Sequence, residues 1–172
     1  KQLAEEVEVR LEHGLRANID DLLWCHGLLL ATPENFGYMA GAMKDFLDRT
    51  YYPAQGKVEG LPFAVLISAG NDGSGALTAI ERIARGYPLT RVIEPIIAKG
   101  ELNAEVLARC EEMGQTMAAG PATASQRAIV LTARSKLPAG AKSAPEARSR
   151  ARTNAKSGQS NGLSMPETKA AQ

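Results

Sequence analysis

Two short stretches contain the residues best suited to chemistry in this chain. The first, Thr32-Pro33-Glu34-Asn35-Phe36-Gly37, offers polar side chains, an aromatic ring and a glycine directly after an apolar run. The second, Ala69-Gly70-Asn71-Asp72-Gly73-Ser74-Gly75, combines several glycines with an amide and a carboxylate. Glycine lets the backbone approach a bound molecule closely, and amide and backbone N–H groups can bind the polar edge of a flat ligand. Both stretches are therefore candidate ligand-binding loops.

Each loop follows a run typical of a strand that is buried on both faces. Residues 28–31 are apolar, and we expect the strand over residues 28–32 to end at Thr32-Pro33 because proline cannot donate to a ladder. Residues 63–68 form a second apolar, β-branched run. Apolar spacing predicts a helix after each loop, the first with Met39, Met43, Phe46, Leu47 and Tyr51 on one face. Parallel strands end at the same edge of a sheet, where such sheets bind ligands, so the two strands should be neighbours and the loops should meet.

The rest of residues 1–120 continues the alternation of strands and helices. A short helix is predicted over residues 17–24, with Ile19, Leu22 and Leu23 inward and Asp20-Asp21 outward. Residues 91–98 read as a strand whose Pro95 suits an edge. A last helix over residues 102–119 should bury Leu102, Val106, Cys110, Met113 and Met117. This pattern predicts a three-layer α/β domain with a parallel sheet.

The composition fits one globular domain followed by a basic extension. Residues 1–120 carry 11 Lys and Arg against 17 Asp and Glu, whereas residues 121–172 carry 9 against 2. We assign residues 1–120 to the domain. Apart from residues 128–132, residues 121–172 are small, polar or basic, and we interpret them as a mostly disordered tail. A basic tail can bind nucleic acid, but a solvated extension is the simpler interpretation.

Several classes of protein are disfavoured by what the sequence contains. Its two cysteines are too few for a disulfide framework, so we expect a reducing, cytoplasmic location. No apolar run is long enough to span a bilayer, so we expect no membrane partner. Gly70 and Gly75 have the spacing of a phosphate loop, but Ala76-Leu77 stands where that loop needs Lys and Ser or Thr. Nucleoside triphosphate binding is thereby disfavoured.

The first stretch also carries a family resemblance. The loop Thr32–Gly37, followed by Met39, Gly41, Met43-Lys44 and Phe46-Leu47-Asp48-Arg49, resembles the flavin loop and third helix of flavodoxin-like NAD(P)H-dependent oxidoreductases. That group includes FMN reductases and quinone reductases, and a weaker similarity extends to about residue 119. The resemblance implies a flavodoxin-like sheet in the order 2-1-3-4-5, with residues 28–32 as the third strand.

The resemblance assigns FMN to the two loops. Its binding residues would be Thr32, Pro33, Glu34, Asn35, Phe36 and Gly37 in the first loop, and Ala69, Gly70, Asn71, Asp72, Gly73 and Gly75 in the second. Asn35 and the first loop's backbone would bind the N5/O4 edge of the flavin, and Phe36 or Tyr38 would pack on its ring. The second loop would line the pyrimidine side. The charge of Asp72 would disfavour an anionic reduced flavin and lower its potential.

The activity implied is an FMN-dependent oxidoreductase that passes electrons from NAD(P)H to a quinone, a free flavin or a similar small acceptor. No metal and no catalytic side chain are expected, because hydride passes from the nicotinamide to the flavin. The alternatives are a flavodoxin-type electron carrier and a non-enzymatic or inactive fragment. We also expect a homo-oligomer that pairs through the helix after the first loop, using Tyr38, Met39, Met43 and Tyr51-Tyr52.

The N-terminal region has two interpretations. Apolar spacing allows one helix over residues 1–15, whereas Val7, Val9 and Leu11 alternate with charged residues as in a strand over residues 7–12, which we favour. Related proteins hold the FMN phosphate between their first strand and first helix, and Lys1–Glu6 resembles the interior of that helix. We therefore expect an unfilled place between the second and third strands, a marginal fold, and weak or absent FMN binding by this chain.

Overall fold

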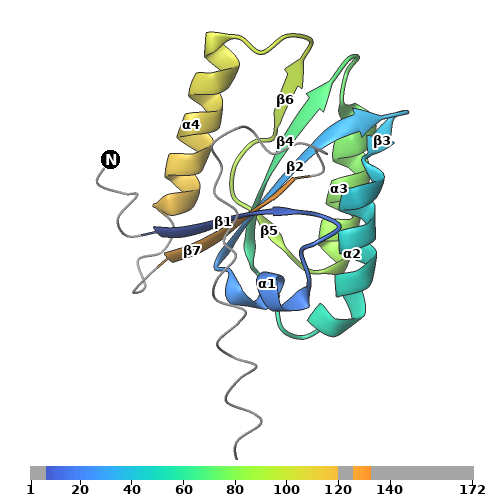
Figure 1. Cartoon of the computed structure of the whole chain (residues 1–172), viewed down its shortest axis with the longest axis vertical. Coiled ribbons are helices and arrows are strands. Elements are labelled where there is room, and N and C mark those ends of the chain that lie inside the picture. The colour runs from blue at the N-terminus through green and yellow to red at the C-terminus, as the bar shows by residue number, and fades with distance from the viewer. Residues whose placement is uncertain (1–6, 120–125, 133–172) are drawn as a thin grey trace, which may run out of the picture.

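The computed structural model describes residues 7–119 and 126–132, in which strands and helices alternate (Figure 1). The predictions for residues 1–6 and for most of the tail lie outside these residues. The strands are β1 (Val7–His13), β2 (Gly27–Asn35), β3 (Tyr38–Met39), β4 (Pro62–Ala69), β5 (Thr90–Arg91), β6 (Ile96–Lys99) and β7 (Gln126–Thr132). The helices are α1 (Ile19–Trp24), α2 (Gly41–Ala54), α3 (Ser74–Gly86) and α4 (Ala104–Ala118).

The sheet is parallel apart from one short hairpin. Its order is β1-β7-β2-β4, with β5 and β6 each paired to β4, and these pairs all run parallel. Residues 28–33 of β2 pair in register with residues 63–68 of β4, which confirms that the two apolar runs are neighbours. Only β3, in the described residues, runs antiparallel to its partner, β2. The predicted α/β fold with a parallel sheet is confirmed.

β7 occupies the place that the sequence analysis left unfilled. It follows α4 in the chain, yet it lies between β1 and β2, and Ala128 pairs with both Val9 and Gly27. Leu131 is fully buried in the main core. The expected gap between the second and third strands is therefore wrong, as is the assignment of residues 126–132 to a disordered tail. β7 thus pairs with β1 on one side and with β2 on the other. Without it, both strands would expose unpaired backbone groups at these edges.

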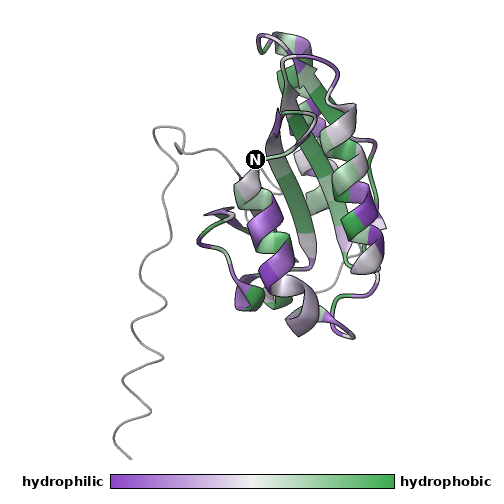
Figure 2. Ribbon diagram, turned by 90° about the vertical axis from the view of Figure 1, so that its right-hand side faces the viewer, coloured by the Kyte–Doolittle hydropathy of each residue, from purple (hydrophilic) through white to green (hydrophobic). Residues whose placement is uncertain are grey.

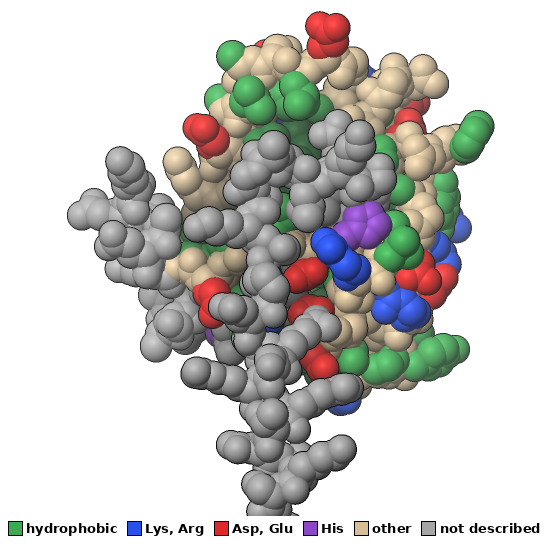
Figure 3. Space-filling view, in the orientation of Figure 1, with side chains coloured by type: hydrophobic (Ala, Val, Ile, Leu, Met, Phe, Trp, Pro, Cys, Tyr) green, Lys and Arg blue, Asp and Glu red, His purple; other side chains and the backbone are tan. Residues whose placement is uncertain are grey.

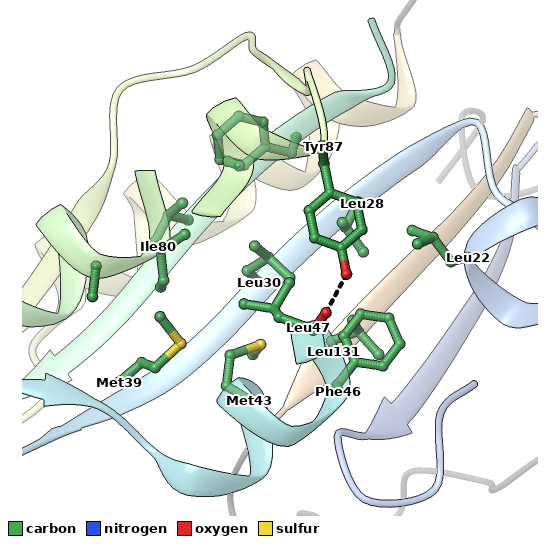
Figure 4. Close-up of a cluster of buried hydrophobic side chains, with 14 of the residues drawn as sticks. Leu22, Leu28, Leu30, Met39, Met43, Phe46, Leu47, Ile80, Tyr87 and Leu131 are labelled. Atoms are coloured by element: carbon green, nitrogen blue, oxygen red, sulfur yellow. Dashed lines mark hydrogen bonds between the residues drawn. The ribbon is translucent and has the colours of Figure 1, made fainter. Parts of the chain in front are cut away.

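Helices cover both faces of the sheet and give three layers (Figure 1). The main core lies between the sheet and α1, α2 and α3, and α4 packs over a smaller cluster on the other face. Figure 2 shows the central strands as hydrophobic, whereas the helices mix hydrophobic and hydrophilic residues. Figure 4 labels Leu22, Leu28, Leu30, Met39, Met43, Phe46, Leu47, Ile80, Tyr87 and Leu131 in the main core. Within the described residues, none of the helices has the length and apolarity to cross a membrane.

The N-terminal elements confirm the strand but correct the orientation of the first helix. Residues 7–13 form β1, so a continuous helix through residue 15 is wrong. In α1, Asp21 is 4% exposed and Leu23 is 43% exposed, the reverse of the prediction. Asp21 can be buried because its carboxylate accepts from the Asn18 N–H at 3.0 Å in a capping box and lies 3.8 Å from the Arg10 guanidinium.

β2 runs past its proline, so the predicted end at Thr32-Pro33 is wrong. The strand continues to Asn35. Among the described residues β7 pairs with β2 as far as Ala31, so within them Pro33 has no ladder partner on that side and stands as on an edge. An edge is the position in which a strand tolerates proline.

The region after α3 also differs from the prediction. The single strand expected over residues 91–98 is divided into β5 and β6, with Pro95 between them. Helix α4 begins later than expected because Asn103 caps it, accepting from the Val106 N–H at 2.9 Å. Leu102 consequently lies outside the helix and is 59% exposed, whereas Met113 is buried as predicted. Val106, Cys110 and Met117 are only partly buried.

Candidate functional site

The first predicted loop is a tight hairpin. Asn35 pairs with Tyr38, which leaves Phe36 and Gly37 as the turn between β2 and β3. Both have positive φ, 52° and 71°, as in a type I′ turn. A bulky residue rarely adopts this conformation, and the Phe36 side chain is fully exposed. In Figure 3 a hydrophobic side chain projects from the corner where Figure 1 places the hairpin. The hairpin turn thus carries an aromatic residue, Phe36, that has an unfavourable backbone conformation and faces solvent.

Thr32 connects this hairpin to α2. Its buried hydroxyl donates to the Pro33 carbonyl at 2.9 Å and accepts from the Ala40 N–H at 3.0 Å. Ala40 is the N-cap of α2. Because the hydroxyl is engaged within the protein, we expect Thr32 to position the hairpin rather than to contact a ligand.

The second predicted loop leads from β4 into α3. The Asp72 carboxylate accepts from the Ser74 backbone N–H and from the Ser74 hydroxyl, both at 2.7 Å. The bond from the Ser74 backbone, followed by the bond from its hydroxyl, lowers the pKa of Asp72 below its ordinary value, and the charge of Lys99 adds to this effect. Asp72 therefore presents an ionised, exposed carboxylate at neutral pH.

The two loops are in direct contact, as the sequence analysis predicted. The Glu34 carboxylate accepts from the Gly73 N–H at 3.1 Å and from the Ala76 N–H at 3.4 Å. Beside this contact, a Cβ added at Gly75 would lie 1.9 Å from the carbonyl oxygen of Gly37. Only a glycine allows the two backbones to pack this closely.

The predicted site residues differ in how far solvent, and hence a ligand, can reach them. The exposed ones are Asn35, Phe36, Gly37, Gly70, Asn71 and Asp72. Those half-buried are Pro33, Glu34 and Gly75, and those buried are Thr32, Ala69 and Gly73. The exposed residues thus lie on both of the two contacting loops. The assignment of these residues to a cofactor stays a prediction.

One charged residue at this edge was missed by the sequence analysis. Lys99 ends β6, pairs with Ala69 of β4 and lies close enough to Asp72 for its charge to lower that pKa. The signal was available, because a strand predicted over residues 91–98 places the next residue at the same carboxyl edge. The edge therefore carries a cation beside its carboxylate.

A cavity of about 280 Å³ lies next to the site, between the sheet and α4. Its walls are largely aliphatic and include Leu66 and Val106. Thr32 and Pro33 are the members of the predicted site that reach it. The cavity thus adds an apolar surface beside the loops, whereas the hydrogen-bonding groups lie on the loops themselves.

The sequence also matches a known family. Residues 3–93 match the NADPH-dependent FMN reductases. The chain belongs to this family. A flavodoxin of Aquifex aeolicus (strain VF5) is 35% identical over 71 residues, which are 41% of this chain and 38% of that protein. The similarity therefore spans well under half the length of that relative.

Solved structures confirm the flavodoxin-like fold. A WrbA-like flavodoxin from Agrobacterium tumefaciens superposes with a TM-score of 0.52 at 14% identity, covering 66% of this chain and 95% of its own. A flavodoxin from the domain Archaea gives a TM-score of 0.51 at 20% identity, covering 61% of this chain and 71% of its own. At these identities the likeness concerns the fold alone.

The exposed groups of the two loops are of the kinds that would bind the isoalloxazine ring of FMN. The isoalloxazine ring is flat, with apolar faces and a polar edge. Asn35 and Asn71 offer amides to such an edge, and the exposed rings of Phe36 and Tyr38 offer aromatic faces. A Cβ at Gly70 would meet nothing within 4 Å, so the backbone there is open to close approach.

Proposed function

We propose that this chain is an FMN-dependent oxidoreductase that uses NAD(P)H to reduce a small acceptor such as a quinone or a free flavin. The observation that supports it is the pair of contacting loops at the carboxyl edge of β2 and β4, which carry exposed amides, aromatic rings and open glycine backbone. Membership of the NADPH-dependent FMN reductases supports the same activity. When bound, FMN would accept hydride from the nicotinamide and deliver electrons to the acceptor.

In this proposal the protein binds and orients, and no side chain transfers a proton. Asn35 and the backbone of residues 35–37 would hold the polar edge of the cofactor, and Gly70 and Asn71 would border its other side. Phe36 or Tyr38 would pack on the ring and exclude water from it. The ionised carboxylate of Asp72 would oppose negative charge on the reduced cofactor and so lower its potential.

The test is NAD(P)H oxidation by the purified chain with FMN and menadione. We expect oxidation that requires both additions and exceeds the rate with free FMN. Replacing both amides, Asn35→Ala with Asn71→Ala, should weaken FMN binding, whereas Gln55→Ala at the exposed end of α2 should not. A rate no higher than that of free FMN would contradict the proposal. An FMN titration made first measures how tightly the chain binds the cofactor.

A flavodoxin-type electron carrier is the second candidate, and the similarity to the A. aeolicus flavodoxin favours it. The two candidates differ in how the FMN becomes reduced. A reductase oxidises NAD(P)H unaided, whereas a carrier takes electrons from a partner protein or from dithionite. Mixing the FMN-loaded chain with NADPH alone and following flavin absorbance decides between them.

We also propose that the chain forms a homo-oligomer and works in the cytoplasm, where NAD(P)H is available. The surface predicted for pairing needs a correction, because Met39 and Met43 are buried in the chain's own core. Tyr38 and Tyr52 remain available, at 42% and 78% exposed. Light scattering at micromolar concentration tests the assembly, and a monomer would count against it.

A further inference from the structure

Glu34 makes the only side-chain hydrogen bonds, within the described residues, that join the two loops. It extends from the end of β2, next to the hairpin turn, and its carboxylate reaches the start of α3. One oxygen accepts from the Gly73 N–H at 3.1 Å and the other from the Ala76 N–H at 3.4 Å. Gly73 is the N-cap of α3 and Ala76 lies in its first turn. The N–H groups of a first turn lack partners inside the helix, so this carboxylate satisfies two of them from a neighbouring strand.

The negative charge of the Glu34 carboxylate is favourable at the N-terminus of α3. The N-terminus of a helix carries partial positive charge and stabilises a carboxylate. Asp72 occupies the same terminus by accepting from Ser74. The start of α3 is therefore already supplied with two anionic acceptors by the chain itself.

The backbone beside Glu34 leaves little freedom for the loops to shift independently. Gly75 packs against the carbonyl of Gly37, at a distance that would place a Cβ 1.9 Å from the oxygen. The hairpin turn and the first turn of α3 are thus joined twice, by this packing and by the Glu34 carboxylate. A change that releases the carboxylate should loosen both loops together.

We propose that Glu34 is a positioning residue that fixes the spacing of the two ligand-binding loops through the N-terminus of α3, rather than a group that contacts the cofactor. The proposal rests on the proposed function, in which FMN binds across both loops. It revises the role of Glu34, whose backbone the sequence analysis assigned to the flavin edge. FMN affinity should then depend on Glu34 even though its side chain is engaged inside the protein.

Three substitutions at Glu34 test separately the contributions of its acceptor oxygens, its charge and its length. Glu34→Ala removes both acceptors and leaves two helix N–H groups without partners. Glu34→Gln keeps an acceptor of the same length without the charge, and it protects the test if the alanine variant folds poorly. Glu34→Asp keeps the charge but is one methylene shorter and should not reach both N–H groups. The matched control is Glu59→Ala, an exposed glutamate in the connection between α2 and β4.

The experiment measures amide hydrogen exchange and FMN affinity in the full chain, the latter by calorimetric titration with FMN. In Glu34→Ala we expect faster exchange at Gly73 and Ala76, and also at Ala40 behind the hairpin, with Ile80 in the middle of α3 unchanged. FMN affinity should fall about tenfold, which corresponds to loss of one charged hydrogen bond. Glu34→Gln should restore part of both properties, and Glu59→Ala should change neither.

Two results would overturn the proposal. One is faster exchange in α3 alone with unchanged FMN affinity, since Glu34 would then be a local helix cap. The other is unchanged exchange at Gly73 and Ala76, since the contact would then be absent in solution. If the unmodified chain binds no FMN, the proposed function fails, and exchange at Ala40 still decides whether Glu34 couples the loops.

Discussion

Gly75 packs so closely on Gly37 that a Cβ at Gly75 would lie 1.9 Å from the Gly37 carbonyl oxygen. Gly75→Ala must therefore displace the hairpin or the first turn of α3, because both contacting groups are backbone. We expect a loss of about 1–3 kcal/mol in the free energy of unfolding, as for overpacking, together with weaker FMN binding. Urea denaturation and FMN titration measure the two effects.

The control for this prediction is the same substitution at Gly114 in α4, where a Cβ would meet nothing within 4 Å. Gly114→Ala should leave FMN binding unchanged and stabilise the helix by about 0.5–1 kcal/mol. If Gly75→Ala behaves like Gly114→Ala, the backbone contact is not as close as the structure shows.

Phe36 gives a prediction in which stability and binding change in opposite directions. Its φ of 52° is unfavourable for a bulky residue, whereas Asn followed by Gly is the preferred pair for a type I′ turn. Phe36→Asn should raise the free energy of unfolding by roughly 1 kcal/mol. FMN affinity should fall about two- to tenfold if the exposed ring packs on the flavin. A variant that is less stable would show instead that the ring packs within the protein.

The strands and the site edge could be predicted from local signals in the sequence. Two mostly apolar runs, each closely followed by a polar loop, predict adjacent buried strands at residues 28–32 and 63–68. The structure confirms this pairing. The sequence does not predict the hairpin, because Pro33 indicates the end of the strand. Its turn depends on Phe36 adopting a conformation that this residue type disfavours, so the local signal was misleading.

Two other features depend on contacts between distant parts of the chain. The pairing of Ala128 with Val9 and Gly27 joins segments separated by most of the domain, and no local pattern in the tail indicates where a strand inserts. The Glu34 side chain likewise meets Gly73 only because β2 and β4 are neighbours. The sequence predicted that these two loops meet, but not which side chain would join them.

β7 changes the expected effect of truncation. Removal of a wholly disordered tail would leave melting nearly unchanged, but deleting residues 121–172 removes β7, the strand between β1 and β2. We expect a chain ending at residue 120 to melt at a much lower temperature than one ending at residue 132. Leu131→Ala should cost about 2–5 kcal/mol, because Leu131 is fully buried.

The measurement is thermal melting by circular dichroism on the full chain, both truncated chains and the point variant. Val9→Ala serves as the control, since Val9 is 59% exposed on the neighbouring strand and should change stability little. Equal melting temperatures for the two truncated chains would show that β7 does not stabilise the sheet.

Tyr87 connects α3 to α2 through its hydroxyl, which lies 2.8 Å from the Thr50 hydroxyl and donates to the Leu47 carbonyl (Figure 4). Burial is the main cause that raises the pKa of Tyr87 to about 12, against about 10 for a free tyrosine. The folded chain therefore binds this proton more tightly than the unfolded chain does. Its contribution to stability is complete below about pH 10 and is lost as the pH rises through about 12.

Tyr87→Phe should remove that dependence on pH. At neutral pH the variant should be less stable by about 1–3 kcal/mol, because the Thr50 hydroxyl loses a buried partner. At alkaline pH the difference should shrink, since the unmodified chain loses the contribution of the Tyr87 proton while the variant has none to lose. Urea denaturation at stepped pH values, compared with Tyr52→Phe at a 78% exposed position, measures this convergence. Stability curves that stay parallel from neutral to alkaline pH would show that the Tyr87 hydroxyl is not held protonated by the fold.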